Sequence, residues 1–238
     1  MLITHVNTMN QNLFEIIDLL SESDLNIVVQ TVEDHLSSKL GETIALSDYH
    51  HYATPAVHQS LSPKRERVLA EDSVSRLLSL PSFRKLLNDY PGHQIGSVVY
   101  DSLSKENRPQ LYFGLVRPNQ LSDIGKPHCD YWFHDADDLG WPRGNTIKFW
   151  VALCIEKGLN GLLFYPSAPS QVPFRIIDLD GVKRPVIDCD ATALGPPLLP
   201  HLTSGQALKF NDDVLHCGAV NQGLMTRVSM EVTMVPTK

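Results

Sequence analysis

The sequence predicts a mainly β protein, a sandwich or barrel supported by a helical N-terminal part. Apolar residues recur at helical spacing in the first ninety or so residues. After Pro91 the chain instead alternates short β-rich runs with turn residues. A length of 238 residues suits one compact domain. We therefore expect a single domain over 1–238, with about 1–92 as mostly helical support and about 93–238 as the β core.

The first two helices are predicted from apolar spacing and from a start signal between them. Leu13, Ile16, Ile17 and Leu20 recur at helical intervals. A Ser-Glu-Ser-Asp segment then begins at Ser21, and a second amphipathic run follows it and ends near Gly41. Two amphipathic helices are expected here.

The stretch from Asp48 to Arg67 contains His50, His51 and His58 with two prolines and no clear period. It predicts an irregular exposed loop, in a position to cover a site. Because no carboxylate or cysteine is spaced to complete a metal site, the three histidines receive no role.

A further helical pattern runs from Glu71 to Leu87, and Pro81 divides it. Proline lacks the amide hydrogen that a helix interior needs but suits a first turn. We expect Pro81 to begin a new helix.

The β-rich runs are short, as in a sandwich or barrel. They are GSVVYDSL, QLYFGLVR, TIKFWVALCI, GLLFYP, FRIIDL, ALKFN and RVSMEVTMV. Four prolines between Asp188 and His201 predict an irregular excursion before the final strands.

Composition excludes several classes of function. The formal net charge is −7 and the basic residues are scattered, so no basic stripe for nucleic acid is present. No apolar run approaches the roughly 20 residues that span a bilayer, and the N-terminus lacks a signal-peptide pattern. The four cysteines occur singly. We expect a cytoplasmic protein with reduced thiols, acting on a small molecule without nucleic-acid or membrane partners.

The segment KPHCDYWFHD contains His128 and Asp130, whose side chains share a face on an extended strand. A His-x-Asp pair alone is a weak signal. Downstream, His216 follows a β-rich run, and Arg227 comes eleven residues later in another. Two histidines and one carboxylate suit iron(II), because they leave three positions open for a 2-oxo acid and dioxygen.

Arg227 completes this prediction. A 2-oxoglutarate molecule that chelates a metal through its keto acid directs its far carboxylate away, where a planar two-pronged donor suits it. On the last strand Arg227, Ser229, Glu231 and Thr233 share one face. The alternate residues are apolar and are expected to pack under the helices.

These motifs, HCD, then LHCG, then R-x-S, resemble the iron(II)/2-oxoglutarate-dependent dioxygenases, in particular the phytanoyl-CoA dioxygenase-like branch. The resemblance covers roughly residues 95 to 236. It implies a double-stranded β-helix (a jelly roll, cupin-like) buttressed by α-helices. It also implies catalytic metal ligands at His128, Asp130 and His216, with the cosubstrate held by Arg227 and Ser229.

The family oxidises its substrate with dioxygen while 2-oxoglutarate is converted to succinate and carbon dioxide. Hydroxylation is its usual outcome. Chlorinating relatives replace the carboxylate ligand with a small residue, so Asp130 disfavours halogenation. Desaturation, ring closure and epimerisation stay open.

Four further residues are candidates for the substrate pocket. If strand alternation continues, Trp132 shares the face of the metal ligands, although a core role is equally consistent. Lys148 and Trp150 share one face of a central strand, where Lys148 either meets a carboxylate or lies at the strand end. Tyr112 is the fourth candidate.

The resulting hypothesis is an oxygenase that hydroxylates an unactivated C–H bond of a small polar metabolite, such as an amino acid or natural-product intermediate. One alternative keeps the enzyme class but makes the substrate carrier-bound or a protein. Two others are a cupin-like metal-binding protein without oxygenase activity and a hydrolytic zinc enzyme. Arg227 argues against both, since neither needs a keto-acid clamp.

Overall fold

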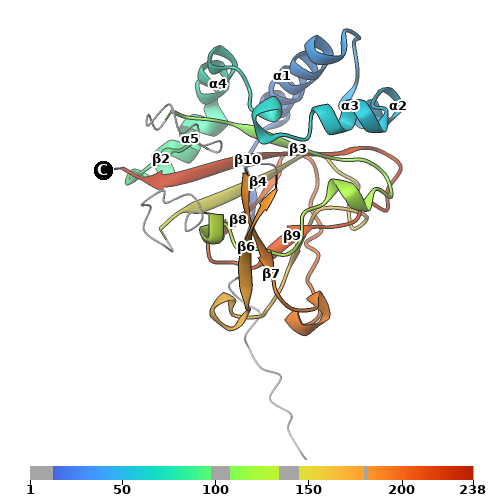
Figure 1. Cartoon of the computed structure of the whole chain (residues 1–238). Helices are drawn as coiled ribbons and strands as arrows, with labels where there is room; N and C mark the ends of the chain where they lie inside the picture. The colour runs from blue at the N-terminus through green and yellow to red at the C-terminus, as the bar shows by residue number, and fades with distance from the viewer. Residues whose placement is uncertain (1–12, 98–107, 134–144, 180–181, 238) are drawn as a thin grey trace, which may run out of the picture.

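The computed structural model describes residues 13–97, 108–133, 145–179 and 182–237. A main antiparallel sheet occupies the centre, with helices against one face and smaller β elements opposite the other (Figure 1). The predicted run GSVVYDSL lies mostly within 98–107 and therefore falls largely outside the described residues.

The main sheet has six strands in the order β1-β8-β4-β10-β2, and β3 also pairs with β10. Their bounds are β1 Glu15–Asp18, β2 His93–Ile95, β3 Tyr112–Val116, β4 Ile147–Cys154, β8 Gln206–Asn211 and β10 Arg227–Pro236. Strand β10 is central, because it pairs with β4 along one edge and with β3 and β2 along the other.

The opposite layer is built from two short antiparallel pairs. They are β5 (Leu162–Phe164) with β9 (His216–Gly218), and β6 (Phe174–Leu179) with β7 (Val182–Ile187). An isolated bridge between His128 and His216 adds one residue pair to the β5–β9 ladder. The irregular excursion predicted between Asp188 and His201 contains only one short 3-10 helix, Ala191–Leu194.

The helical layer confirms most of the predicted helices. Helix α1 (Glu22–Leu40) begins after Ser21, whose side chain accepts a hydrogen bond from the Asp24 amide, and ends at Gly41 with φ of 75°. Helices α4 (Glu71–Leu78) and α5 (Pro81–Asp89) flank the break at Pro81, which occupies the first turn of α5.

Two predictions in the N-terminal part were wrong. Residues 13–20 form no helix, because Glu15–Asp18 adds to the edge of β8 as strand β1. The stretch 48–67 is no irregular loop. It contains α2 (Tyr49–Tyr52), α3 (Pro55–Ser60) and the 3-10 helix η2 (Lys64–Arg67), preceded by the 3-10 helix η1 (Leu46–Asp48).

The two faces of β10 divide as its alternation predicted. Val228, Met230, Val232 and Met234 are fully buried in the core cluster that α1, α4 and α5 share with the sheet. The other face points toward the β5–β9 layer, so polar side chains of β10 lie between the two layers. Within the described part of the chain, no helix is long and apolar enough to cross a membrane.

Candidate metal and cosubstrate site

The two predicted ligand histidines are brought together by a backbone bridge. His128 and His216 exchange both amide-to-carbonyl hydrogen bonds, each 2.9 Å, so the two residues lie directly opposite one another. Their ring centroids are 4.8 Å apart. With a carboxylate oxygen of Asp130, their nitrogens form a group whose candidate ligand atoms all lie within 4.8 Å of one another.

Both imidazoles are oriented by local backbone carbonyls. The Nδ1 atom of His128 lies 2.8 Å from the carbonyl oxygen of Lys126, and Nδ1 of His216 lies 2.9 Å from that of Val214. When Nδ1 donates to the carbonyl, the lone pair of Nε2 is left for a metal ion. Burial, followed by the charge of His216, lowers the pKa of His128 to about 4. The ring is therefore neutral near pH 7, as a ligand must be.

Asp130 lies two residues after the bridge residue His128 and pairs with a lysine of β4. Its Oδ2 is 3.4 Å from Nζ of Lys148, without the alignment of a hydrogen bond, and is otherwise unpartnered. Lys148 also donates a 2.9 Å hydrogen bond to Thr233. Burial alone would raise the pKa of Asp130, but Lys148 and the two histidines hold it well below its ordinary value. The carboxylate is thus ionised.

Arg227, the first residue of β10, reaches toward the β5–β9 ladder. Its Nη1 donates a 2.6 Å hydrogen bond to the carbonyl of Gly161, and its guanidinium lies 5.3 Å from the ring centre of Trp150. The Nε atom is buried without a partner. Burial lowers the pKa of Arg227 to about 10, which still leaves it charged near pH 7.

Ser229 follows on the same face of β10, opposite Gly114 of β3. Its Oγ is buried without a partner, and a Cβ built on Gly114 would lie only 2.9 Å from that oxygen. The glycine therefore leaves room beside the hydroxyl. Unpaired buried polar atoms are rare and costly, so the unpartnered groups of Asp130, Arg227 and Ser229 fit a bound metal and a bound carboxylate.

Tyr112, Trp150 and Lys148 were predicted as substrate residues, and the structure places each of them in a different environment. Tyr112 pairs with Glu231 across β3 and β10, on the face that carries Arg227 and Ser229. Trp150 lies beneath Arg227. Lys148 meets a protein carboxylate, Asp130, rather than one from a ligand.

Trp132 is not on a strand. The chain turns at Asp130, and residues 131–133 form a helical turn, so the alternation that placed Trp132 beside the ligands was wrong. Its ring is fully buried and stacks on Phe174 at 4.3 Å, in the core cluster that also holds Cys129 and Cys217. Trp132 is therefore a core residue, which was the alternative interpretation of its position. Cys129 and Cys217 are buried in that core cluster and are not part of the group formed by His128, Asp130 and His216.

Three charged residues near this site had no role predicted from the sequence. Lys64 and Arg67 of η2 lie over the ring of Tyr112, at 5.8 and 5.1 Å from its centre. Glu231 shares the inner face of β10 with Arg227 and exerts the largest charge effect on Lys64. The alternation of β10 had placed Glu231 on the face of Arg227 without giving it a role, and no local pattern marked Lys64 or Arg67.

A second buried polar cluster lies between the helices and the loop before His128; we call it the loop-anchoring network. Arg117 binds Asp123 through two side-chain hydrogen bonds of 2.9 Å. His58 Nε2 is 3.3 Å from the same carboxylate, and its Nδ1 is 3.2 Å from the hydroxyl of Tyr49. The expectation that His58 lies in an exposed loop was therefore wrong.

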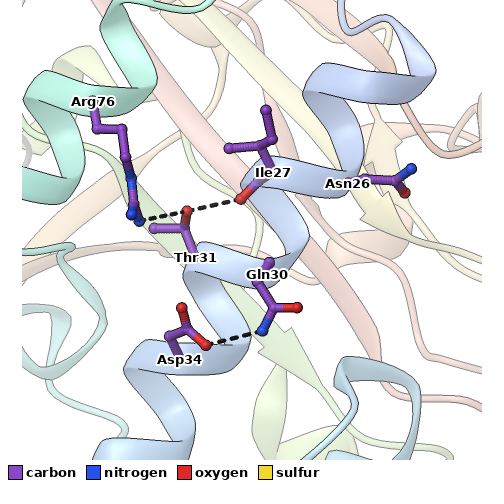
Figure 2. A pocket seen from close by; sticks show the side chains of 6 residues that line it. All are labelled: Asn26, Ile27, Gln30, Thr31, Asp34 and Arg76. Carbon is purple, nitrogen blue, oxygen red and sulfur yellow. Dashed lines mark hydrogen bonds between the residues drawn. The ribbon is translucent and has the colours of Figure 1, made fainter.

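A surface groove of about 280 Å³ lies between α1 and α4 (Figure 2). Its polar groups bond to one another: Gln30 to Asp34 at 2.9 Å, and Arg76 to Thr31 at 3.2 Å (Figure 2). Its lining includes no predicted site residue, so the groove has no part in the site described above.

Comparison with known proteins identifies the fold. No family model and no curated protein sequence matches the chain. Solved structures do match: EvdO2 from Micromonospora carbonacea var. aurantiaca, complexed with 2-oxoglutarate, has a TM-score of 0.52 at 17% identity. That match covers 70% of this chain and 64% of EvdO2.

Two other matches extend over nearly the whole chain. EctD from S. alaskensis, with 2-oxoglutarate and 5-hydroxyectoine, has a TM-score of 0.56 at 14% identity over 96% of this chain and 73% of its own. SnoN, the non-heme α-ketoglutarate-dependent epimerase from nogalamycin biosynthesis, has a TM-score of 0.54 at 15% identity over 94% and 79%. The predicted fold, a jelly roll with helical support, is confirmed.

Proposed function

We propose that the chain is an iron(II)/2-oxoglutarate-dependent oxygenase that hydroxylates a C–H bond of a small polar metabolite. The observation that carries this proposal is the set of inward polar groups left without partners. Two imidazoles and a carboxylate converge within 4.8 Å, and Arg227 and Ser229 present unpaired polar atoms on strand β10 of the main sheet. A structural metal site would require only the two histidines and the carboxylate, and not the polar atoms of Arg227 and Ser229.

Arg227 lies at a distance from the metal-ligating residues that one cosubstrate molecule could span, with one end on the metal and the other on the guanidinium. A Cβ built on Gly218, two residues after His216 in β9, would lie 3.7 Å from Nη1 of Arg227. Positions two apart on a strand are roughly 7 Å from each other. A five-carbon diacid that chelates a metal at one end is of the length to meet the guanidinium at the other.

In this proposal His128, Asp130 and His216 hold iron(II), and Arg227 with Ser229 binds the far carboxylate of 2-oxoglutarate. Iron with 2-oxoglutarate and dioxygen supplies an oxidant strong enough for an unactivated C–H bond. Lys148 orients the Asp130 carboxylate through its ion pair, and the Nδ1 hydrogen bonds fix the two imidazoles. The apolar side chains of Trp150, Phe164 and Phe210 keep water from this part of the interior.

The structural neighbours are consistent with the class. EvdO2 and EctD were each determined with 2-oxoglutarate, and EctD also with bound iron. Placement in the phytanoyl-CoA dioxygenase-like branch depends on the HCD, LHCG and R-x-S residues and is part of the same proposal. SnoN is an epimerase, so the type of product is decided by experiment and not by the fold.

The test is aerobic incubation of the purified protein with iron(II), 2-oxoglutarate and pools of small polar metabolites. Succinate formation that depends on both additions, together with a product heavier by one oxygen atom, is the expected result. Succinate formed with an isomeric product would replace hydroxylation by epimerisation. The absence of succinate from folded, iron-loaded protein under all these conditions would contradict the proposal.

A further inference from the structure

The 3-10 helix η2 carries two cations over the inner face of the sheet, at a position that the metal and cosubstrate do not use. The guanidinium of Arg67 lies 5.1 Å from the ring centre of Tyr112. The ammonium of Lys64 lies 5.8 Å from that ring and 5.3 Å from the ring of Phe133, the third residue after Asp130. Both cations therefore border the region above the metal ligands.

The backbone holds η2 firmly in this position. Val68, directly after η2, forms an antiparallel bridge with Tyr112, and the Leu69 amide donates a 3.0 Å hydrogen bond to the carbonyl of Leu111. On the other side, the carbonyl of Glu66 lies 2.9 Å from Nε2 of His35 on α1. The two cations are thus presented by a segment that is attached to both β3 and α1.

Neither cation has a carboxylate partner in the described parts of the chain. The carboxylate within η2, Glu66, pairs with Lys39 at 2.7 Å and with Arg65 at 3.4 Å. Arg67 donates from Nη2 to the carbonyl of Ser62, but its Nε is buried and unpartnered. A buried donor without an acceptor is destabilising, and a ligand oxygen would offset that cost.

The charges that surround this position leave it net positive. Apart from the effect of its burial, Lys64 is influenced most by the charge of Glu231, followed by the charges of Lys148 and Asp130. Lys148 and Asp130 already compensate each other through their ion pair. Glu231 also acts on Arg227 and Lys148, so its charge is shared among several cations, and neither Lys64 nor Arg67 has a carboxylate of its own among the described residues.

We propose that Lys64 and Arg67 form a substrate subsite for an anionic group, a carboxylate or a phosphate, bound above Tyr112. Arginine suits either group because its fork matches two oxygens, and lysine adds a mobile point charge. The subsite deepens the proposed function, on which it depends: it narrows the substrate to a small anionic metabolite. By binding the anionic group, the subsite would also hold the carbon that is to be oxidised near the metal.

The test uses protein loaded with zinc(II) in place of iron and titrated first with 2-oxoglutarate by calorimetry. Inorganic phosphate and, in a parallel arm, acetate are then titrated into the saturated complex. Wild-type protein is expected to bind at least one of them, and the preferred arm identifies the group as phosphate or carboxylate. Arg67→Gln and Lys64→Gln should each weaken that binding by at least about tenfold, since one charged hydrogen bond contributes that much.

Matched variants separate this role from a general effect of charge. Arg65 lies in the same turn but its side chain is 78% exposed, so Arg65→Gln should retain wild-type anion binding. Lys64→Arg keeps the charge and should also retain most of it. Equal binding by wild type and Arg67→Gln, or no anion binding by wild type, would overturn the subsite.

The two proposals fail in different ways. A zinc-loaded protein that does not bind 2-oxoglutarate counts against the oxygenase proposal, and phosphate and acetate are then titrated without it to test the subsite. An Arg67→Gln variant with weakened 2-oxoglutarate binding and unchanged anion binding would assign Arg67 to the cosubstrate and overturn the subsite.

Discussion

Two buried polar clusters in this protein differ in how far the protein itself completes them. In the loop-anchoring network, Tyr49, His58, Asp123 and Arg117 supply one another with partners. In the cluster around the predicted metal ligands, atoms of Asp130, Arg227 and Ser229 are buried without any. Because buried polar groups are normally paired, the first cluster is complete as a structural element, and the second requires ligands.

This difference predicts opposite effects of substitution. Changes in the incomplete cluster should remove ligand binding and activity while the protein still folds. Changes in the complete cluster should lower stability and leave the chemistry of the remaining folded molecules largely intact.

Asp130→Ala should abolish succinate formation, because it removes the only carboxylate of the proposed ligand set. The measurement is succinate released in air with iron(II) and 2-oxoglutarate, on protein whose melting transition stays cooperative. Asp213→Ala is the control, since Asp213 is exposed and only three residues from His216. Wild-type turnover by Asp130→Ala would remove this residue from the site.

Arg227→Gln should raise the KM for 2-oxoglutarate by roughly 10 to 100-fold, as expected when a charged hydrogen-bonded pair is lost. The effect on kcat at saturating 2-oxoglutarate should be smaller. Initial rates over a range of 2-oxoglutarate concentrations measure both quantities. An unchanged KM would show that another residue binds the cosubstrate.

Asp123→Asn should lower the free energy of unfolding by about 3 kcal/mol, because it leaves Arg117 buried without its counterion. The two side chains are 1% and 11% exposed, so water compensates little. Denaturant unfolding measures the loss. Asp89→Asn, which disrupts an exposed pair with Lys85, should cost no more than about 0.5 kcal/mol. Similar losses in both variants would contradict the structural role of the network.

The same network predicts a loss of stability in acid. Burial alone would raise the pKa of Asp123, but hydrogen bonds from Arg117 and His58 hold it well below its ordinary value. The pKa of an aspartate in the unfolded chain is about 3.9, so the stabilisation is complete above that pH and declines as the pH falls further. Unfolding free energies measured below pH 4 should therefore fall less steeply in Asp123→Asn than in wild type.

The parts of the fold that were predictable carry local signals. The ends of α1 follow from Ser21 and Gly41, and the inner and outer faces of β10 follow from strict alternation. Strand β1 was missed because its apolar spacing over a few residues fits a helix as well, and only pairing with β8 decides between them.

The candidate site also contains residues that a sequence pattern indicates and residues that no local pattern indicates. His128, Asp130, His216 and Arg227 could be chosen as candidates because their types and order are rare in combination, and the structure brings the first three together. Lys64, Arg67 and His58 were missed because their partners are far along the chain: His58 meets Asp123, and Arg67 meets Tyr112. Trp132 was misplaced because the chain turns at Asp130, where alternation ends.

The most direct test of the incomplete cluster is a visible spectrum recorded without oxygen. Iron(II) and 2-oxoglutarate added anaerobically to the purified protein should produce the weak charge-transfer band of a chelated keto acid. The band should require both additions and should be lost in Asp130→Ala. A folded wild-type protein that shows no such band, and that also forms no succinate in air, would contradict the assignment of His128, Asp130, His216 and Arg227.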